Sequence, residues 1–227
     1  MEVKERIRES DTEPIYLHQT LSYVVTKRII DICISLILLL LLAPFLLLVA
    51  LIIFLNDGKP IIYKQVRVGK NGHHFVILKF RSMNERKKSR KSSKHSPNPI
   101  LWANGIPENY IHKSKMTDEV TRVGRFLRKY SIDELPQLIN VLRGDMSIVG
   151  PRPEVPDITK YYNNKQQKRL SVKPGITGYA QVMGRSNINH GQKIDYDLYY
   201  IKNCSFLMDM KIIYKSIICV IKTDGAY

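Results

Sequence analysis

The sequence predicts an α+β, helix-rich fold: a single membrane-associated globular domain with a small β-hairpin and a long N-terminal membrane helix. Three observations predict it. Residues 32–55 form a run of 24 residues without a charge, residues 61–81 alternate around an Asn-Gly turn, and several later segments carry helix start and stop signals. With 227 residues, the chain is long enough for one domain and leaves little for a second.

The uncharged run is long enough to cross a bilayer. A straight helix of this length would reach about 36 Å, and a bilayer core is about 30 Å thick. Pro44 lies near the middle of the run, where it removes one backbone hydrogen bond. The helix can therefore be kinked and spanning, which the physical arguments alone favour. It can also be broken at Pro44 and return to the same side, which suits the positive residues on both flanks.

The hairpin strands are expected at 61–68 and 75–81, with Gly69–Gly72 as the turn. Lys79 and Arg81 share one face of the second strand. They fit either protective charge on an edge strand or a phosphate-binding role. Residues 84–116 follow as a basic loop, which fits either a solvated loop or a segment that contacts anionic lipid.

The rest of the chain is mostly helical in this interpretation. We expect helices at 122–129, 135–142 and 161–172, a strand candidate at 178–184, and an amphipathic C-terminal helix at 205–221.

Charge and cysteine content narrow the class of protein. The formal net charge of +16 favours contact with nucleic acid, anionic lipid or phosphorylated substrates. Cys33, Cys204 and Cys219 are odd in number and lack metal-ligand spacing. They predict a reducing compartment and argue against a disulfide scaffold or a zinc site. The sequence also contains no GxxxxGK[ST], GxGxxG or HExxH motif.

Two features between residues 131 and 154 point to phosphate chemistry. Asp133 and Glu134 are adjacent carboxylates. They fit a structural capping box that begins at Ser131, or a helix start at Asp133 that could face a substrate and a metal. Arg152 lies between two prolines, which restrict its backbone and reduce the entropy lost when it binds phosphate oxygens. The alternative for this segment is a rigid connector with an incidental arginine.

Taken together, these residues resemble the bacterial sugar transferase family, the small monotopic phosphoglycosyl transferases. The resemblance covers about residues 26–221. The matching segments, in chain order, are Lys27–Asp31, Pro44, Gly58–Ile61, Lys79–Met83, Arg122–Glu154, Lys173–Gly178 and Phe206–Ile212. No single segment is decisive, but their order and density are specific.

The resemblance implies transfer of a phosphosugar from a UDP-sugar to a polyprenyl phosphate, usually undecaprenyl phosphate, with release of UMP and a requirement for Mg²⁺. Asp133 would be the nucleophile that carries the phosphosugar, and Asp133 and Glu134 would hold the metal. The residues implied to contact substrate or phosphate are Lys79, Arg81, Arg128, Arg152, Arg185 and Asp197. At the membrane, Lys27 would pair with Asp209.

The family also implies a topology and a location. Its members have a re-entrant helix broken by a proline, so Pro44 would turn the membrane helix back to the same face. We then expect an N-terminal extension at 1–25, a re-entrant helix at 26–56, and a catalytic domain at 57–227 on the cytoplasmic face of the bacterial inner membrane.

The expected partners are a UDP-sugar, a polyprenyl phosphate and an anionic membrane surface, and not nucleic acid. The reaction would be the first membrane step of a surface glycan. The sugar is not readable from the sequence, and the oligomeric state is open, with a homodimer among the options. Two other functions are kept as alternatives: a metal-dependent membrane phosphatase or pyrophosphatase, and a basic membrane-tethered binding module.

Overall fold

The computed structural model describes residues 20–83, 102, 104–110, 120–184 and 188–222. Most of the expected basic loop and the N-terminal extension lie outside these residues, as does Arg185. Within them the fold is helix-rich, with two small two-stranded sheets.

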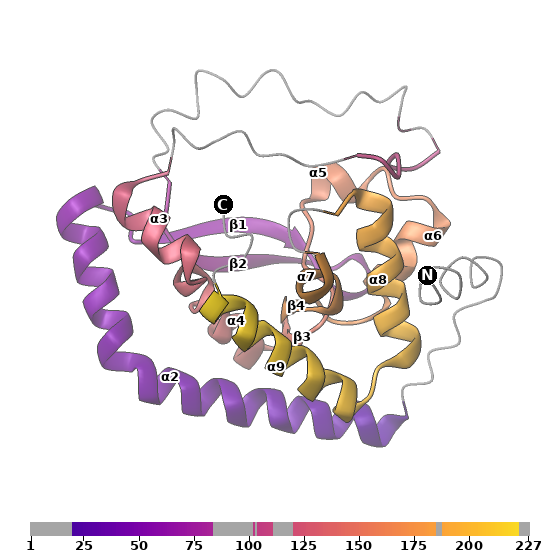
Figure 1. Ribbon diagram of the computed structural model, residues 1–227, viewed down its shortest axis with the longest axis horizontal. Coiled ribbons are helices and arrows are strands. Elements are labelled where there is room, and N and C mark those ends of the chain that lie inside the picture. The colour runs from indigo at the N-terminus through magenta and orange to yellow at the C-terminus, as the bar shows by residue number, and fades with distance from the viewer. Residues whose placement is uncertain (1–19, 84–101, 103, 111–119, 185–187, 223–227) are drawn as a thin grey trace.

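The N-terminal helix, α2, runs from Leu21 to Asp57 and frames the rest of the described chain. Thr20 caps its start, because the Thr20 hydroxyl accepts a hydrogen bond from the Tyr23 backbone amide. Pro44 lies inside the helix, and α2 bends in its middle part, so that two arms enclose the domain from two sides (Figure 1). The expectation of a helix broken at Pro44 is therefore corrected to a bent but continuous helix.

The predicted hairpin is present. Strand β1 (Ile62–Val68) pairs antiparallel with β2 (His74–Phe80), and a 3₁₀ turn at Lys70–Gly72 joins them. Asn71 in this turn has a positive φ of 55°, which asparagine tolerates better than most residues. The register places Lys79 opposite Tyr63, near the end of the hairpin that lies beside α3 (Arg122–Lys129).

The acidic pair lies in a tight connection between α3 and α4 (Gln137–Arg143). After α3, a short 3₁₀ turn, η5 (Ile132–Glu134), carries both carboxylates. Gly144, with φ 92°, ends α4 in the left-handed conformation, close to the end that the sequence predicted at residue 142.

The second half of the domain begins with β3 (Ser147–Val149), which pairs in parallel with β4 (Gly175–Thr177). Between them lie the short helices α5 (Pro156–Thr159) and α6 (Asn164–Gln167) and the 3₁₀ turn η6 (Lys168–Ser171). The chain ends with α7 (Tyr179–Gly184), α8 (His190–Asn203) and α9 (Phe206–Lys222).

Two sequence expectations in this half were wrong and one was confirmed. Residues 178–184 form α7 instead of a strand, and the strand is the preceding segment, β4, because it is this segment that pairs with β3. The helix expected at 161–172 is two short pieces. The C-terminal helix is present as α9.

The interior is divided into small apolar clusters instead of one large core. One cluster seats the second arm of α2, where Val49 and Ile53 pack against Phe80 and Leu127. Another joins β2 to α4 through Phe75, Ile77 and Val141. Further clusters lie under α8 and α9.

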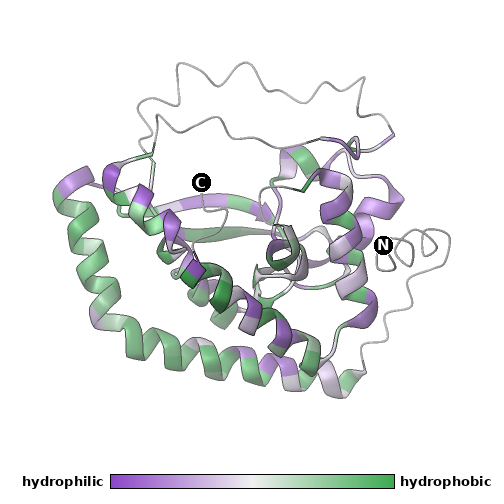
Figure 2. Ribbon diagram, in the orientation of Figure 1, coloured by the Kyte–Doolittle hydropathy of each residue, from purple (hydrophilic) through white to green (hydrophobic). Residues whose placement is uncertain are grey.

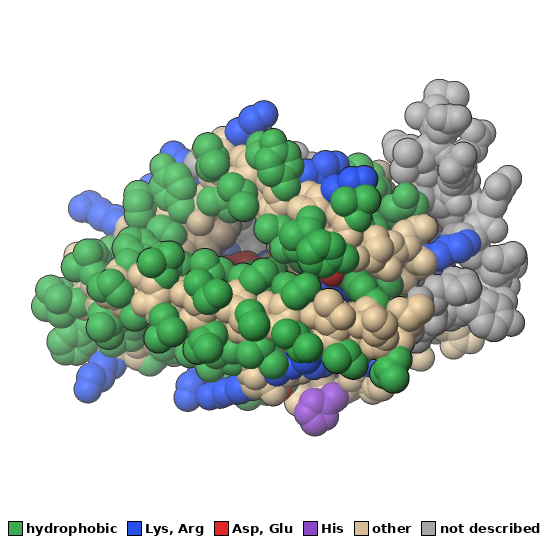
Figure 3. All heavy atoms as spheres, turned by 90° about the horizontal axis from the view of Figure 1, so that it is seen from below, with side chains coloured by type: hydrophobic (Ala, Val, Ile, Leu, Met, Phe, Trp, Pro, Cys, Tyr) green, Lys and Arg blue, Asp and Glu red, His purple; other side chains and the backbone are tan. Residues whose placement is uncertain are grey.

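The outer face of α2 is apolar and exposed. It is the one helix, within the described residues, that is long and apolar enough to cross a membrane by length and composition. Only 11% of its most apolar 18-residue window is buried, so α2 is not the core helix of this domain. Figure 2 shows the hydrophobic character of its long central part, with hydrophilic residues toward both ends. In Figure 3 apolar side chains cover this face and surround a hollow in which acidic atoms are visible.

Candidate functional site

The two carboxylates are presented by a turn and not by a capped helix. Ser131 adopts the left-handed conformation with φ 55° and its side chain caps nothing, so the capping box expected at Ser131 is absent. Asp133 is not the helix cap either, since Pro136 takes that position in α4. Because Pro136 has no amide hydrogen to satisfy, it fits the start of the helix, and the acids are placed one turn earlier.

Glu134 is held by two cations that come from distant parts of the chain. Its Oε1 accepts hydrogen bonds from Lys79 Nζ at 2.7 Å and from Arg152 Nη2 at 2.6 Å, and its Oε2 accepts from Arg152 Nη1 at 3.3 Å. Burial alone would raise the pKa of Glu134, but the charges of Arg152 and Lys79 outweigh it and hold the pKa well below its ordinary value. Glu134 is therefore ionised at neutral pH.

Asp133 differs from its neighbour. Its residue exposure is 7%, and among the described residues no group donates a hydrogen bond to its carboxylate. Burial raises the pKa of Asp133, and the negative charge of Glu134 raises it further, while Lys79, Arg128 and Arg152 act in the opposite direction. The Asp133 carboxylate is therefore near enough to three cations for their charges to lower its pKa, but it forms a hydrogen bond with none of them. This is expected of a group that reacts or binds a ligand.

Arg152 is anchored at its backbone and open at its side chain. Its carbonyl accepts a hydrogen bond from Arg169 Nη2 at 2.9 Å, while its side chain is 40% exposed beside Glu134. The structure therefore brings together four of the predicted site residues, Lys79, Asp133, Glu134 and Arg152, and places Arg128 close enough to affect the charge state of Asp133.

Two other predicted substrate contacts lie elsewhere. The Arg81 guanidinium donates to the backbone carbonyls of Asp57 and Gly58, so it secures the end of α2 instead of facing the acids. Asp197 is 1% exposed and forms an ion pair with Arg169, with 2.7 Å between Oδ2 and Nη2. Asp197 is therefore connected to the backbone carbonyl of Arg152 through Arg169, and not to the Arg152 side chain that contacts Glu134. The prediction for Arg185 falls outside the described residues.

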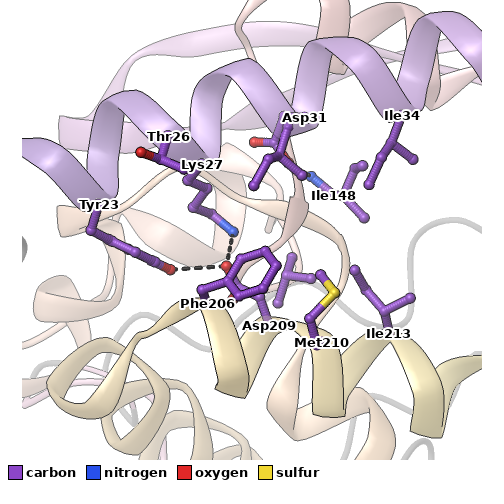
Figure 4. A pocket seen from close by; sticks show the side chains of 12 residues that line it. Tyr23, Thr26, Lys27, Asp31, Ile34, Ile148, Phe206, Asp209, Met210 and Ile213 are labelled. Carbon is purple, nitrogen blue, oxygen red and sulfur yellow. Dashed lines mark hydrogen bonds and ion pairs between the residues drawn. The ribbon is translucent and has the colours of Figure 1, made fainter.

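The predicted pair between Lys27 and Asp209 is present, with 2.6 Å between Nζ and Oδ2 (Figure 4). Asp209 also accepts hydrogen bonds from the hydroxyls of Tyr23 at 2.9 Å and Tyr200 at 2.8 Å. These contacts join the first arm of α2 to α8 and α9. An open crevice beside this network is lined mainly by apolar side chains of α2 and α9, including Ile34, Phe206, Met210 and Ile213.

Sequence reasoning missed three polar residues that hold the site in place. Arg28 donates to the carbonyls of Val141 and Leu142 at the end of α4. Asn140, which is fully buried, accepts from the Leu78 amide at 3.0 Å and donates to the Val76 carbonyl at 2.7 Å. It thereby fixes α4 against the strand that carries Lys79.

Arg169 is the third missed residue, and it lies in a segment that the sequence marked only as polar and helical. Arg28 and Asn140 lie in the segments Lys27–Asp31 and Arg122–Glu154 that carry the family resemblance, but Arg169 lies in none of them.

The described residues contain no group of three or more His, Cys, Asp or Glu side chains that could hold a metal unaided. Asp133 and Glu134 do fit a Mg²⁺ ion that takes one or two carboxylates and completes its shell with water and substrate phosphate oxygens. The free carboxylate of Asp133 is the observation that supports this fit.

Comparison with known proteins gives one family. The model of the bacterial sugar transferase family matches residues 22–223. The chain is 38% identical to the exopolysaccharide production protein ExoY of Sinorhizobium fredii, over 89% of this chain and 88% of that protein. It is 38% identical to the UDP-glucose:undecaprenyl-phosphate glucose-1-phosphate transferase of Caulobacter vibrioides, over 88% of this chain and 72% of that protein. It is also 39% identical to the undecaprenyl-phosphate galactose phosphotransferase of Salmonella typhimurium, of which it spans 41%.

Proposed function

Because the chain belongs to the bacterial sugar transferase family and is a phosphoglycosyl transferase, we propose that it transfers a sugar 1-phosphate from a UDP-sugar to undecaprenyl phosphate. In this proposal the transfer passes through a covalent intermediate on Asp133. The observation that carries the proposal is the contrast between the two carboxylates. Glu134 is fixed by Lys79 and Arg152, whereas Asp133 beside it is ionisable and has no partner among the described residues. The relatives named for UDP-glucose and for undecaprenyl phosphate supply the substrate classes.

In the first step an oxygen of the Asp133 carboxylate attacks the β-phosphorus of the UDP-sugar. A bond from this oxygen to phosphorus forms, the bridging bond to the α-phosphate breaks, and UMP leaves with the electron pair. In the second step an oxygen of undecaprenyl phosphate attacks the same phosphorus, and Asp133 is released as a carboxylate. The acceptor phosphate is already ionised at neutral pH, so neither step needs a general base for activation.

The cations around Asp133 account for stabilisation of the transition state. Charge develops on the phosphate oxygens, and preorganised cations stabilise it more than mobile water does. Lys79 and Arg152 are held in place before substrate arrives, because Glu134 binds both of them. Mg²⁺ held by Asp133 and Glu134 would neutralise further charge on the substrate phosphates.

The proposed location is the bilayer surface, on the cytoplasmic face of the inner membrane. Both arms of α2 are attached to the same domain: the first arm through Lys27 and Arg28, and the second through Val49 and Ile53. A helix whose two ends are held on one side supports a re-entrant seating, with the exposed apolar face of α2 in the lipid. The apolar side chains that α9 leaves exposed suit the same interface: Phe206, Leu207, Tyr214, Ile217 and Ile221.

The covalent step is tested by incubating the purified enzyme with Mg²⁺ and a panel of UDP-sugars, without a lipid acceptor. We expect UMP release to stop at one equivalent, with a phosphosugar adduct on Asp133 detectable by mass spectrometry. Sustained release of UMP would indicate hydrolysis instead. Absence of any adduct in a single turnover with acceptor would indicate direct attack by the lipid phosphate and would contradict the covalent route.

The re-entrant seating is tested with single cysteines at the two ends of α2, in a variant that lacks Cys33, Cys204 and Cys219. Ser22→Cys and Lys59→Cys both lie at exposed positions. An impermeant maleimide should label both cysteines in inside-out vesicles and neither in right-side-out vesicles. Labelling of the two positions from opposite sides would show that α2 spans the membrane.

A further inference from the structure

Arg169 is the largest fully buried side chain in the described part of the domain, and it lies at the edge of a small pocket that Arg152 and Glu154 also line. Its guanidinium is 1% exposed. Nη1 donates to the Tyr162 hydroxyl oxygen at 2.6 Å, and Nη2 donates to the Arg152 carbonyl at 2.9 Å and lies 2.7 Å from Asp197 Oδ2. Burial of a charged guanidinium carries a desolvation penalty, whereas an apolar side chain would fill the same space without one.

Arg169 contacts the segment Pro151–Glu154, in which each of the four backbone carbonyls accepts a hydrogen bond. The Gly175 amide donates to the carbonyl of Pro151, and the Val68 amide donates to the carbonyl of Glu154, both at 2.9 Å. Between these backbone contacts, arginine side chains bind the other two carbonyls: Arg169 that of Arg152, and Arg67 that of Pro153 at 3.2 Å.

This arrangement removes the freedom that the prolines leave. Pro151 and Pro153 have fixed φ angles, and Arg152 before a proline is restricted to extended conformations. The remaining motion is a shift of the segment as a whole, and the hydrogen bond from Arg169 opposes it at Arg152 itself. The side chain of Arg152 then leaves a fixed point toward Glu134, which it meets through two hydrogen bonds.

We propose that Arg169, oriented by Asp197, is a positioning residue that fixes the guanidinium of Arg152 for the substrate diphosphate. This inference rests on the proposed function, in which Arg152 binds the phosphates, and it gives Asp197 a role behind the site instead of at the substrate. The effect is transmitted by the Arg152 carbonyl, so it depends on the presence of the Arg152 side chain. A residue that only stabilised the fold would show no such dependence.

A double-mutant cycle separates the two roles. The chains are wild type, Arg169→Met, Arg152→Ala and the double variant, each measured for kcat and KM of UMP release and for UDP binding by calorimetry. We expect Arg169→Met to lower kcat about 30- to 100-fold in the wild-type background, since a displacement of about 1 Å at a catalytic group can cost about 100-fold. In the Arg152→Ala background the same change should cost less than about threefold.

Two further variants serve as controls. Arg169→Lys keeps the charge but not the planar fork, so it should fold like the wild type and recover only part of kcat. Lys165→Met removes the pair between Lys165 and Asp195, which lies at 3.0 Å and involves α8, the helix that also carries Asp197. It should change kcat less than about twofold in either background.

Equal losses from Arg169→Met in both backgrounds would overturn the inference, as would full activity of Arg169→Met. If Arg169→Met does not fold, the cycle is run with Arg169→Lys and judged by the same criterion. A wild-type enzyme that released no UMP from any UDP-sugar would refute the proposed function. The UDP-binding cycle would still decide whether Arg169 acts through Arg152.

Discussion

Two ionic clusters stand back to back in this domain and differ in what they leave free. The front cluster consists of Lys79, Asp133, Glu134 and Arg152. The rear cluster consists of Glu154, Arg169, Lys193 and Asp197. In the front cluster one carboxylate takes both cations and the other takes none, and Arg152 stays 40% exposed. In the rear cluster both carboxylates are paired, Glu154 with Lys193 at 2.8 Å and Asp197 with Arg169 at 2.7 Å, and Arg169 also lies 4.0 Å from Glu154.

The difference teaches how the same residue types serve chemistry in one place and shape in another. A set in which every acid is paired, with Arg169 and Asp197 buried at its centre, fixes the backbone on which it is built. A set with one acid left over, open on one side, retains a group that can react. The backbone of Arg152 connects the two clusters, because the side chain belongs to the front and the carbonyl to the rear.

The largest effect is expected for Asp133→Asn, which removes the free carboxylate of the front cluster. UMP release should fall by at least about 1,000-fold, because loss of a nucleophile leaves only binding and electrostatic stabilisation. The unfolding midpoint should stay unchanged or rise, because the raised pKa of Asp133 shows that its charged form is poorly stabilised where it lies. If the variant kept more than about a tenth of the wild-type turnover, Asp133 would not be the nucleophile.

A smaller but still large effect is expected for Lys79→Met, which takes one of the two cations from Glu134. We expect a loss of about 100-fold in kcat, since Lys79 also faces the phosphates in the proposed mechanism. Lys79→Arg is the matched control, because it keeps the charge, and it should recover at least about a tenth of the activity. Equal loss in both variants would mean that the shape of the lysine and not its charge is required.

A moderate effect on stability is expected for Glu154→Gln in the rear cluster. Burial would raise the pKa of Glu154, but Lys193, Arg169 and Arg67 hold it well below the ordinary value. A carboxyl whose pKa is lowered by folding stabilises the native state above its unfolded pKa of about 4, and this stabilisation is lost as the pH falls toward the folded pKa. Glu154→Gln should therefore cost about 2 kcal/mol at pH 7, because Lys193, whose side chain is 25% exposed, loses its carboxylate while Arg169 keeps Asp197.

The same difference should shrink progressively as the pH falls below about 4. Denaturant unfolding of the detergent-solubilised wild type and Glu154→Gln, at pH 7 and at about pH 3, measures this difference in the free energy of unfolding. A penalty that is the same at both values would show that Glu154 contributes by packing and not by charge.

The smallest effect is expected for Lys160→Met, which breaks an exposed pair outside both clusters. Lys160 and Asp157 lie 3.5 Å apart, with side chains 54% and 82% exposed. The free energy of unfolding should change by less than about 0.5 kcal/mol, and kcat should not change. A larger loss of unfolding free energy would indicate that exposed ion pairs stabilise this chain as much as the pairs in the two clusters do.

The sequence predicted local features better than connections. The hairpin, α3, the end of α4 at Gly144 and the C-terminal helix followed from turn and helix signals that act within a few residues. The pair of Lys27 and Asp209 joins residues 182 apart in the sequence, and it was the family resemblance that supplied it. The β3–β4 pairing could not be predicted in this way, because each strand has only three residues and their partnership is set by the fold between them.

The candidate site was predictable at its reactive face and not behind it. Arg152 stood out because the prolines on both sides restrict it. Arg169 did not, since an arginine in a polar segment is usually solvated, and only the tertiary fold shows that this one is sealed. Arg81 illustrates the opposite error. It shares a strand face pattern with Lys79, but the end of α2 lies nearer to it than the acids do.

The bend of α2 has a consequence for what the enzyme leaves behind. Under the proposed seating, the described chain contacts a single leaflet, and the new glycolipid is made with its sugar in the cytosol. The helix provides no route to the other leaflet, because both of its ends are fastened to the same domain. Delivery of the sugar to the outside must then be the task of a separate lipid-translocating protein.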